Sequence, residues 1–362
     1  MHDGLTSFGG SPLHQPAPMP GHDLPDLSII IVNWNVHDLL RDCLMAIQRS
    51  PGVVLAEAQQ GGEAAQHLPP SHPLQPAITA EVIVVDNASS DGSAEMVATQ
   101  FPWVRLIANP DNRGFAAANN QGLAISRGRY VLFLNPDTVV VDDALRALVH
   151  YMDLHPEAGA VGPLLRYGDG SLQPSCRRFP TLTIALFEST PIAWHWPDNP
   201  WARHYRMADL QEPTAGVQEV DWLVGAALLV RREALDQVEG FDEGYFMYSE
   251  ELDLCRRLKE AGWRIFYLPF AQVIHYEGRS SEQAIAARHI RFQASKVRYF
   301  RKFHGPLAAE LLRGFLLAAF AAEWLLEGSK WLLGSRRSLR RQRMAAYGQL
   351  LRTKLRENRI SG

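Results

Sequence analysis

The sequence predicts an α/β fold in which a mixed, mostly parallel sheet is flanked by helices. Three runs of residues, 27–32, 81–85 and 130–134, are nearly continuous in apolar, β-forming side chains. Such runs are typical of strands buried on both faces, whereas strands with one wet face alternate apolar and polar residues. A polar loop and a helix-like stretch follow each run, and this alternation indicates a parallel sheet.

Composition narrows the class of protein. The chain has 362 residues, enough for one large α/β domain with appendages, and 46% of them are hydrophobic, which supports a substantial core. Its formal charge of -3 argues against nucleic acid as a partner, because no overall positive field holds phosphates. Cys43, Cys176 and Cys255 are an odd number without metal-like spacing, so we expect a reducing, cytoplasmic location.

The chain divides into three parts. Residues 1–26 are rich in Gly, Pro, His and Ser and lack a basic start followed by an apolar core, so we expect a disordered lead-in rather than a signal peptide. Residues 27–300 form the predicted main domain, with a flexible Gly-, Gln-, Ala- and Pro-rich insertion at 50–79. Residues 301–362 form a predicted amphipathic, basic helical tail.

The run at 130–134 ends abruptly in a carboxylate. Asn135 precedes a proline, which disfavours the helical conformation, and Pro136 cannot donate to a ladder, so the strand must end in a turn that displays Asp137. The carboxyl ends of parallel strands are where open α/β sheets bind ligands. Asp86 stands at the end of the preceding buried run in the same way. The alternative is that Asp137 only caps the helix that begins near residue 142.

Two further segments offer polar groups. In the turn-rich loop 109–115, Gly114 permits close backbone approach and Arg113 offers a fixed charge, which favours a phosphate or sugar contact, although the loop is also an ordinary turn. In the predicted helix that follows Ser249, a natural N-cap, the helix dipole favours Glu250, Glu251 and Asp253 in the first turn. Their mutual repulsion indicates a shared cation or proton.

Seven segments, taken in order, resemble the inverting nucleotide-sugar glycosyltransferases of family two, in particular the rhamnosyltransferase-like branch. The resemblance covers residues 27–281 and is carried by segments 31–35, 84–93, 112–116, 134–137, 240–242, 250–254 and 275–280. It implies a GT-A fold and a hexosyltransferase that moves a sugar from a dTDP- or UDP-sugar donor, with rhamnose as the first expectation. The implied acceptor is a hydroxyl of a cell-surface glycan or a lipid-linked glycan.

The resemblance also implies roles for individual residues. Asp137 would hold Mg²⁺ or Mn²⁺, with His275 completing the shell, although a lone His is more often structural. Glu251 stands at the general-base position, where the family usually has Asp, so Glu250 and Asp253 remain alternatives. Asn135 replaces the first acid of the common metal motif. The implied nucleotide-sugar contacts are Asn33, Asn35, Asp86, Asn87, Arg113, Gly114, Phe115, Asn119 and Asn135.

The chemistry explains why such residues are needed. Glycosyl transfer develops positive charge at the anomeric carbon and negative charge on the departing diphosphate. A divalent cation with oxygen ligands neutralises the leaving group, and one protein carboxylate can suffice to hold it. The acceptor hydroxyl must lose a proton to a positioned base as it attacks from the opposite face, which inverts the anomeric configuration.

The sequence of the tail predicts contact with a membrane surface. Its apolar residues are interrupted by charges, and the clean run 314–322 is too short for a transmembrane helix. Arg336, Arg337, Arg340, Arg341 and Arg343 follow Trp324 and Trp331, which favours peripheral contact of residues 306–343 with the anionic cytoplasmic face of the inner membrane. The alternative is a helix that packs on the main domain or on a second copy in a homodimer.

Two other functions compete with the transferase. A sugar nucleotidyltransferase shares the α/β design but needs an early Gly-rich, basic phosphate loop, and Asn33-Trp34-Asn35 is not one. A catalytically lapsed, sugar-nucleotide-binding scaffold would keep the same loops and perform no transfer.

Overall fold

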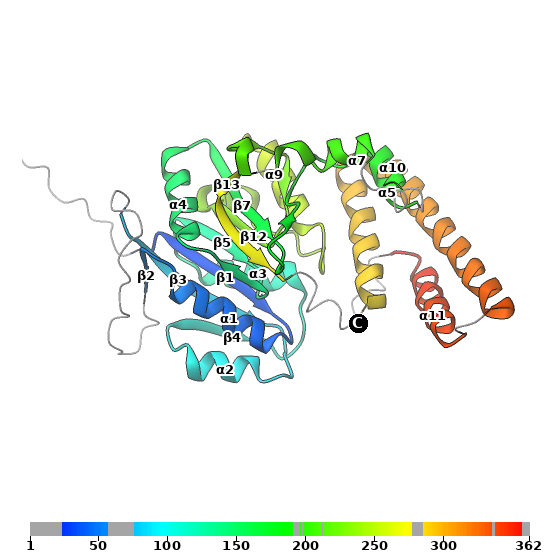
Figure 1. Cartoon of the computed structure of the whole chain (residues 1–362), viewed down its shortest axis with the longest axis horizontal. Coiled ribbons are helices and arrows are strands. Elements are labelled where there is room, and N and C mark those ends of the chain that lie inside the picture. The colour runs from blue at the N-terminus through cyan, green and yellow to red at the C-terminus, as the bar shows by residue number, and fades with distance from the viewer. Residues whose placement is uncertain are drawn as a thin grey trace, which may run out of the picture.

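The computed structural model describes residues 24–56, 76–190, 196, 199–211, 213–276, 285–334 and 337–356. A sheet covered by helices forms the main body, and a pair of C-terminal helices extends away from it (Figure 1). The large sheet has 11 strands, with the central order β10-β13-β7-β12-β5-β1-β3-β2. Its strands are β1 (Leu27–Asn33), β2 (Val53–Leu55), β3 (Ile78–Asp86), β4 (Val104–Ala108), β5 (Tyr130–Leu134), β6 (Thr138–Val140), β7 (Ala158–Arg166), β8 (Leu172–Gln173), β10 (Gln218–Glu219), β12 (Ala227–Arg231) and β13 (Arg264–His275).

The sheet is mixed and mostly parallel in its first half, as predicted. Strand β1 pairs in parallel with both β3 and β5, so the ends of all three strands lie at one edge. Every residue of β5 is buried, which confirms a strand covered on both faces. Strand β12 then runs antiparallel to β5 and to β7. Strands β9 (Cys176–Arg177) and β11 (Trp222–Leu223) form a second, two-stranded antiparallel sheet.

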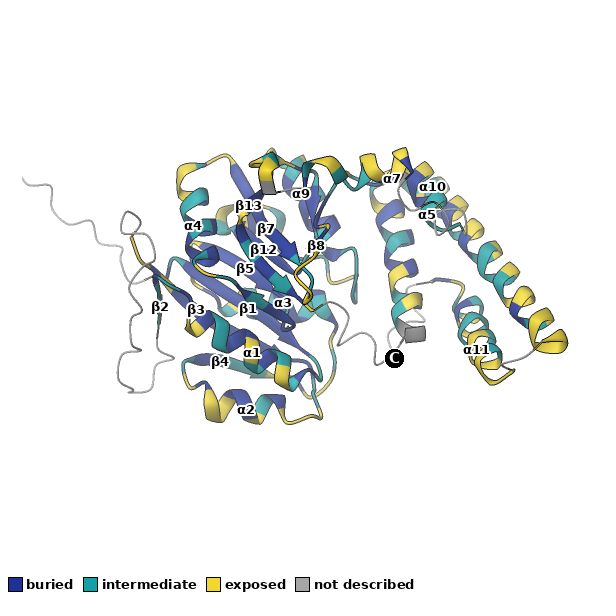
Figure 2. Ribbon diagram, in the orientation of Figure 1, coloured by how far each residue is buried: buried dark blue, intermediate teal, exposed yellow. Residues whose placement is uncertain are grey.

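Helices cover both faces of the sheet. One hydrophobic cluster joins the sheet to α1 (His37–Gln48), α2 (Ser93–Gln100) and α4 (Ala144–Leu154). The other joins it to α3 (Phe115–Ile125), α8 (Arg232–Val238), α9 (Glu250–Glu260) and α10 (Ile285–Leu333). The shorter helices α5 (Leu182–Glu188) and α7 (Pro200–Tyr205) pack near α10. The sheet strands are accordingly dark in Figure 2.

Two predicted boundaries are corrected. The edges of the proposed insertion at 50–79 are strands, because β2 pairs with the start of β3, with Val53 opposite Ile78. The remainder of the insertion, residues 57–75, and residues 1–23 of the lead-in lie outside the described residues. The boundary at residue 300 also moves, because α10 starts at Ile285 and has Tyr299 and Phe300 fully buried against the main body.

Helix α10 bends once. Gly305 has φ 85° and Pro306 follows it, and a proline removes a helical hydrogen bond, so the axis changes direction here. Beyond the bend, α10 pairs with α11 (Arg337–Thr353), and many of its residues are exposed (Figure 2). The segment Arg288–Leu333 is long and apolar enough, by length and composition, to cross a membrane. The charge-free run 314–322 is only part of this segment and is by itself too short for such a crossing.

Candidate active site

A cleft of about 580 Å³ opens at the carboxyl ends of β1 and β5. It gathers eight of the predicted site residues from segments that are far apart in the sequence: Asn87, Gly114, Phe115, Asn135, Asp137, Glu250, Glu251 and His275. Because parallel strands deliver their loops to one edge of a sheet, the strand-end residues meet here as the sequence predicts.

Sheet pairing brings Asp137 and His275 together. Strand β13 runs antiparallel to β6 with His275 opposite Thr138, and the Tyr276 amide donates to the Asp137 carbonyl at 2.9 Å. Asp137 Oδ1 consequently lies 3.3 Å from His275 Nε2, and each residue is only 5% exposed. Asn135 Nδ2 is also 3.4 Å from that ring nitrogen.

The Asp137–His275 pair suits a divalent cation. His275 Nδ1 lies 3.1 Å from Gln173 Oε1, an acceptor, so Nδ1 carries a proton and Nε2 faces the Asp137 carboxylate. An imidazole nitrogen and a carboxylate oxygen at this distance can together ligate one metal ion. Within the described residues no three His, Cys, Asp or Glu side chains cluster. A cation here would therefore take its other ligands from water and phosphate oxygens, as Mg²⁺ commonly does.

The Gly114 loop forms one side of the cleft. Gly114 has φ 86°, and a Cβ at this position would lie 2.6 Å from the carbonyl oxygen of Phe246, so only glycine fits. The Phe115 amide donates to the same carbonyl at 2.7 Å, and Asn87 Nδ2 donates to the Gly114 carbonyl at 3.1 Å. These contacts join the Gly114 loop to the loop that precedes α9.

The loop before α9 is strained. Tyr248 and Ser249 both adopt left-handed conformations, with φ 71° and 64°, which cost about 1–3 kcal/mol for each non-glycine residue. Ser249 is the N-cap residue of α9, as predicted, but its side chain makes no cap hydrogen bond. The strained turn instead directs the first residues of α9 toward the cleft, where Glu250 and Glu251 lie side by side in the chain.

The carboxyl groups of Glu250 and Glu251 are partly withdrawn from water. One carboxyl oxygen of each, Oε2, is buried and has no hydrogen-bond partner within the described part of the chain. Burial, and then the charge of Glu251, hold the pKa of Glu250 well above its ordinary value. Burial also raises the pKa of Glu251, but backbone N–H groups and then Arg177 oppose this rise. Glu251 is therefore the carboxyl that ionises more readily, and Glu250 the one that keeps its proton.

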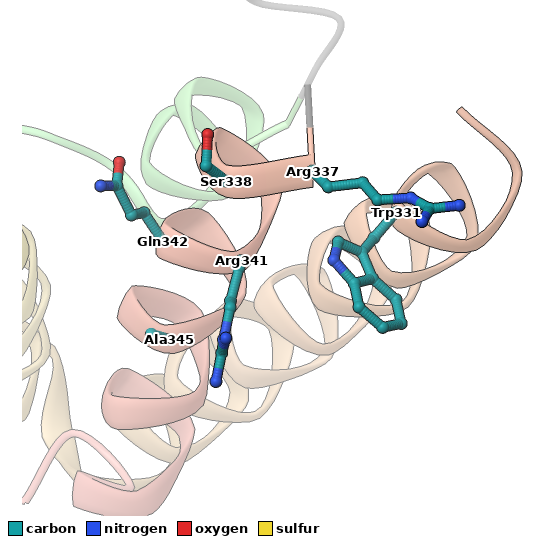
Figure 3. A pocket seen from close by; sticks show the side chains of 6 residues that line it. All are labelled: Trp331, Arg337, Ser338, Arg341, Gln342 and Ala345. Atoms are coloured by element: carbon teal, nitrogen blue, oxygen red, sulfur yellow. The ribbon is translucent and has the colours of Figure 1, made fainter. Parts of the chain in front are cut away.

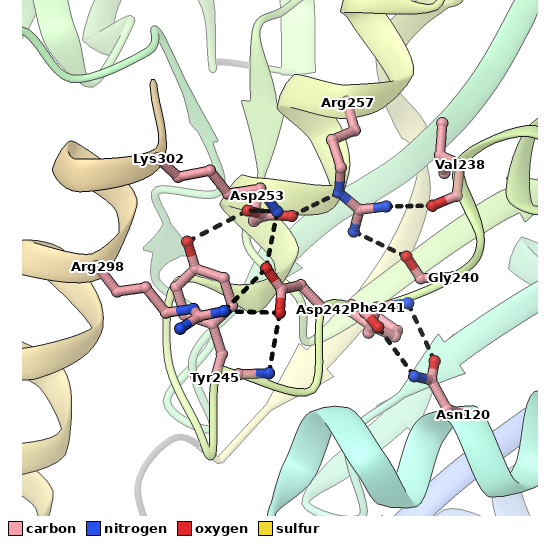
Figure 4. Close-up of polar contacts among 11 residues, drawn as sticks. Asn120, Val238, Gly240, Phe241, Asp242, Tyr245, Asp253, Arg257, Arg298 and Lys302 are labelled. Atoms are coloured by element: carbon pink, nitrogen blue, oxygen red, sulfur yellow. Dashed lines mark hydrogen bonds and ion pairs between the residues drawn. The ribbon is translucent and has the colours of Figure 1, made fainter. Parts of the chain in front are cut away.

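Asp253 faces away from the cleft. It is fully buried and accepts from Arg257 Nε at 2.5 Å and Tyr245 Oη at 3.2 Å, and Lys302 Nζ of α10 lies 2.7 Å away (Figure 4). Lys302 and Arg298 also contact Asp242, so this network joins α10 to α9. Asp253 has a structural role here, which leaves Glu251 and Glu250 as the candidate bases.

Five predicted nucleotide contacts do not line the cleft. Asn33 Nδ2 donates to the buried Asp86 carboxylate at 2.8 Å, and the Ser90 amide donates to Asn35 Oδ1 at 2.7 Å, so these side chains hold two loops together. Asn119 Nδ2 donates to the Phe115 carbonyl, and Arg113 is half exposed, 3.8 Å from Asp111. Nucleotide contact by these five residues stays a prediction.

Part of the cleft wall was not predicted from the sequence. Trp34 lies between two residues that were singled out, and Phe246, Met247 and Tyr248 directly precede the acids, so proximity in the sequence could have indicated all four. Four further residues come from the start of α10, and no motif marks them. They are Arg288, His289, Arg291 and Phe292.

Comparison with known proteins identifies the family of this chain. Residues 28–235 match the family described as Glycosyl transferase family 2. The chain belongs to this family. It is a glycosyltransferase, and the family is an inverting one, as the resemblance of its motifs predicted.

Two relatives of this glycosyltransferase are similar to it over about half of the chain. N-acetylglucosaminyl-diphospho-decaprenol L-rhamnosyltransferase of Mycobacterium tuberculosis is 39% identical over 223 residues, which is 58% of this chain and 71% of that protein. Rhamnosyltransferase WbbL of Escherichia coli K12 is 34% identical over 171 residues, 45% of this chain and 61% of that protein.

A solved structure confirms the fold of this glycosyltransferase. A mannosyltransferase from Pyrobaculum calidifontis, in complex with GDP-Man and Mn²⁺, superposes with a TM-score of 0.51 and 19% sequence identity, covering 91% of this chain and 86% of that one. The predicted GT-A fold with a C-terminal helical tail is thereby confirmed.

Proposed function

We propose that this glycosyltransferase moves rhamnose from a nucleoside diphosphate, dTDP or UDP, to a hydroxyl of a lipid-linked sugar. The observation that carries the proposal is the pair of buried carboxyls, Glu250 and Glu251, which share one cleft with Asp137 and His275. The choice of donor and acceptor is supported by two relatives that are named rhamnosyltransferases, one of which is named for a diphospho-decaprenol acceptor.

Glu251 acts as the general base in this proposal. Its carboxylate takes the proton of the acceptor hydroxyl as that oxygen bonds to the anomeric carbon. The bond from the anomeric carbon to the diphosphate oxygen breaks, so the nucleoside diphosphate leaves from the opposite face and the configuration inverts. Glu250, with its pKa held well above the ordinary value, remains protonated beside it and does not repel the forming charge on the leaving group.

Asp137 and His275 would hold the divalent cation. Bound there, Mg²⁺ or Mn²⁺ would supply positive charge that stabilises the departing diphosphate. The chain's own contribution is orientation: Gln173 fixes the tautomer of His275, and the β6–β13 pairing fixes its distance from Asp137.

The C-terminal hairpin, which consists of α10 beyond its bend and α11, would contact the membrane that carries the acceptor. Exposed side chains on α10 beyond the bend include Leu325, Leu326, Leu332 and Leu333, the last 90% exposed. Trp331 and the arginines Arg337 and Arg341 line an open hollow of about 570 Å³ between the two helices (Figure 3). Exposed leucines, an indole and guanidinium groups are the combination that binds the interface of an anionic bilayer, on the cytoplasmic face in this proposal.

A transfer assay tests the proposal. Purified full-length protein with Mn²⁺, dTDP-rhamnose and a polyprenyl-diphospho-N-acetylglucosamine should form a rhamnosylated lipid detectable by mass spectrometry. Asp137→Asn should lower the rate at least about 100-fold, as loss of charge stabilisation at a leaving group does. Asp38→Asn, at an exposed position on α1, is the matched control and should retain the wild-type rate.

The two competing functions predict different results in separate measurements. Donor binding by calorimetry without transfer to any acceptor would indicate a lapsed scaffold. Release of pyrophosphate from dTTP and a sugar 1-phosphate would indicate a nucleotidyltransferase. Either result would end the proposed function.

A further inference from the structure

Two arginines at the start of α10 face the cleft. Arg288 and Arg291 both line it, and the guanidinium carbon of Arg291 lies 3.9 Å from the centroid of the Phe246 ring. The backbone of Phe246 is itself fixed, because its carbonyl accepts from the Phe115 amide. Packing against a fixed ring orients the guanidinium and leaves its N–H edge available for a ligand.

Neither arginine has an acidic partner within the described residues. Other arginines of the main body are engaged: Arg298 on the same helix contacts Asp242, and Arg257 contacts Asp253. Burial lowers the pKa of Arg291, as expected for a cation that is partly withdrawn from water without a nearby carboxylate, although an arginine stays charged. Two guanidinium groups that line a cleft and form no ion pair within the described residues indicate an anionic ligand.

We propose that Arg288 and Arg291 bind the diphosphate of the lipid-linked acceptor, an inference that rests on the proposed function. Paired guanidinium groups recognise phosphate oxygens through parallel, charge-assisted hydrogen bonds. The acceptor brings negative charge into a cleft that already contains Asp137, Glu250 and Glu251. The two arginines offset that charge.

The position of the arginines favours the acceptor over the donor. Arg291 packs on Phe246, and Phe292 contacts Tyr248 with ring centroids 5.7 Å apart, so this wall adjoins the loop that leads into Glu250 and Glu251. The acceptor hydroxyl must reach those carboxyls. Beyond its bend, the same helix carries Leu307 and Leu311, which are 74% and 56% exposed and offer apolar surface to a lipid chain that a donor lacks.

Arg288→Gln and Arg291→Gln test the site with two acceptors. With the diphosphate-linked lipid acceptor, each variant should raise the acceptor KM about 10- to 100-fold, the value of one or two hydrogen bonds to a charged group. With a neutral alkyl glycoside of the same sugar, and for the donor KM, each variant should stay within about twofold of wild type. Arg301→Gln, on the exposed side of the same helix, is the matched control and should change neither constant.

A binding measurement makes the test independent of turnover. Calorimetry of farnesyl diphosphate, with the donor site saturated by UDP and Mn²⁺, should show binding to wild type and to Arg301→Gln, and at least tenfold weaker binding to both cleft variants. A rise in donor KM with unchanged acceptor KM would assign the arginines to the donor and overturn the inference. Unchanged constants with active wild type would overturn it alone, whereas a wild type that transfers to neither acceptor would overturn the proposed function as well.

Discussion

At the scale of single residues, the site depends on two carboxyls that differ in their surroundings. Glu250 and Glu251 are neighbours in the chain, yet Glu251 has Arg177 and more backbone N–H groups to favour its charged form, whereas the charges of Glu251 and Asp253 disfavour the charged form of Glu250. Asp253 was an alternative candidate from sequence. Because an α-helix turns about 100° per residue, two residues beyond Glu251 a side chain points to nearly the opposite side, and there Asp253 meets Arg257 and Lys302.

Substitution of the two carboxyls should separate their roles. Glu251→Gln should lower kcat about 10²- to 10⁴-fold, the usual contribution of a general base, because an amide cannot take the proton. Glu250→Gln resembles the protonated form of a group whose pKa is well raised, so it should retain most of the activity. Steady-state rates with the soluble glycoside acceptor measure both.

The pH profile provides the control for this pair. Since the base must be ionised and burial raises the pKa of Glu251, wild-type kcat should fall as pH falls through that raised pKa. The residual rate of Glu251→Gln should lack this fall. A Glu251→Gln enzyme with the wild-type rate and profile would exclude it as the base.

Residue-level predictability has a physical pattern here. Asp137 could be found because a proline after a buried strand forces a turn at a known edge of the sheet. His275 lies next to Asp137 because β13 pairs with β6, and no local feature of the sequence predicts that pairing. Arg288 and Arg291 could not be found, because their place in the cleft depends on where α10 packs rather than on a motif.

At the scale of elements, α10 holds the loop that carries the acids. Along its first half, Ser295 Oγ donates to the Met247 carbonyl at 2.8 Å, and Lys302 Nζ lies 2.7 Å from both Asp242 and Asp253 (Figure 4). Ser295 and Lys302 are about two helical turns apart, so both lie on one face of the helix. The left-handed residues Tyr248 and Ser249 persist because α10 and the Gly114 loop fix the turn from both sides.

Loss of the lysine should loosen this arrangement. Asp242 and Asp253 each contact two cations, and Lys302→Gln removes the one that they share while Arg298 and Arg257 remain. Because Asp253 is fully buried, the loss should lower the free energy of unfolding by about 1–3 kcal/mol. Lys330→Gln removes a longer contact of 3.9 Å to Glu327 in the hairpin and should cost less than about 0.5 kcal/mol. Urea denaturation of both variants measures the difference. Equal effects would mean that the α10 network adds no stability.

At the scale of the whole molecule, the C-terminal hairpin stands apart from the sheet. It is held together by its own contacts, among them Arg340 to the buried Glu327 at 2.9 Å. The sequence indicated its basic and apolar composition but not the bend at Gly305, because a Gly-Pro pair allows many directions and only packing selects one. The exposure of the leucines in this pair of helices is therefore evident only from the structure.

Vesicle binding tests the proposed membrane contact. Full-length protein should sediment with phosphatidylglycerol vesicles and much less with phosphatidylcholine vesicles, because each arginine near an anionic surface contributes about 1 kcal/mol. Leu332→Ser combined with Leu333→Ser should weaken binding at least about tenfold, since each leucine loses its apolar burial. Leu154→Ser, on α4 and 64% exposed, is the control.

Two results would contradict the membrane contact. One is equal sedimentation with charged and neutral lipid. The other is a dimer in solution that the double leucine substitution dissociates, which would assign the hairpin to a homodimer interface.

The bend at Gly305 has a geometric consequence. The residues on one side of it form a wall of the reaction chamber, and those on the other side form the outlying pair of helices. The angle of this one bend therefore sets the distance and tilt between the opening of the cleft and the surface to which the C-terminal hairpin binds. Acceptors anchored in that surface would be sorted by reach, so that the length between anchor and sugar becomes a specificity determinant without any contact to the sugar itself.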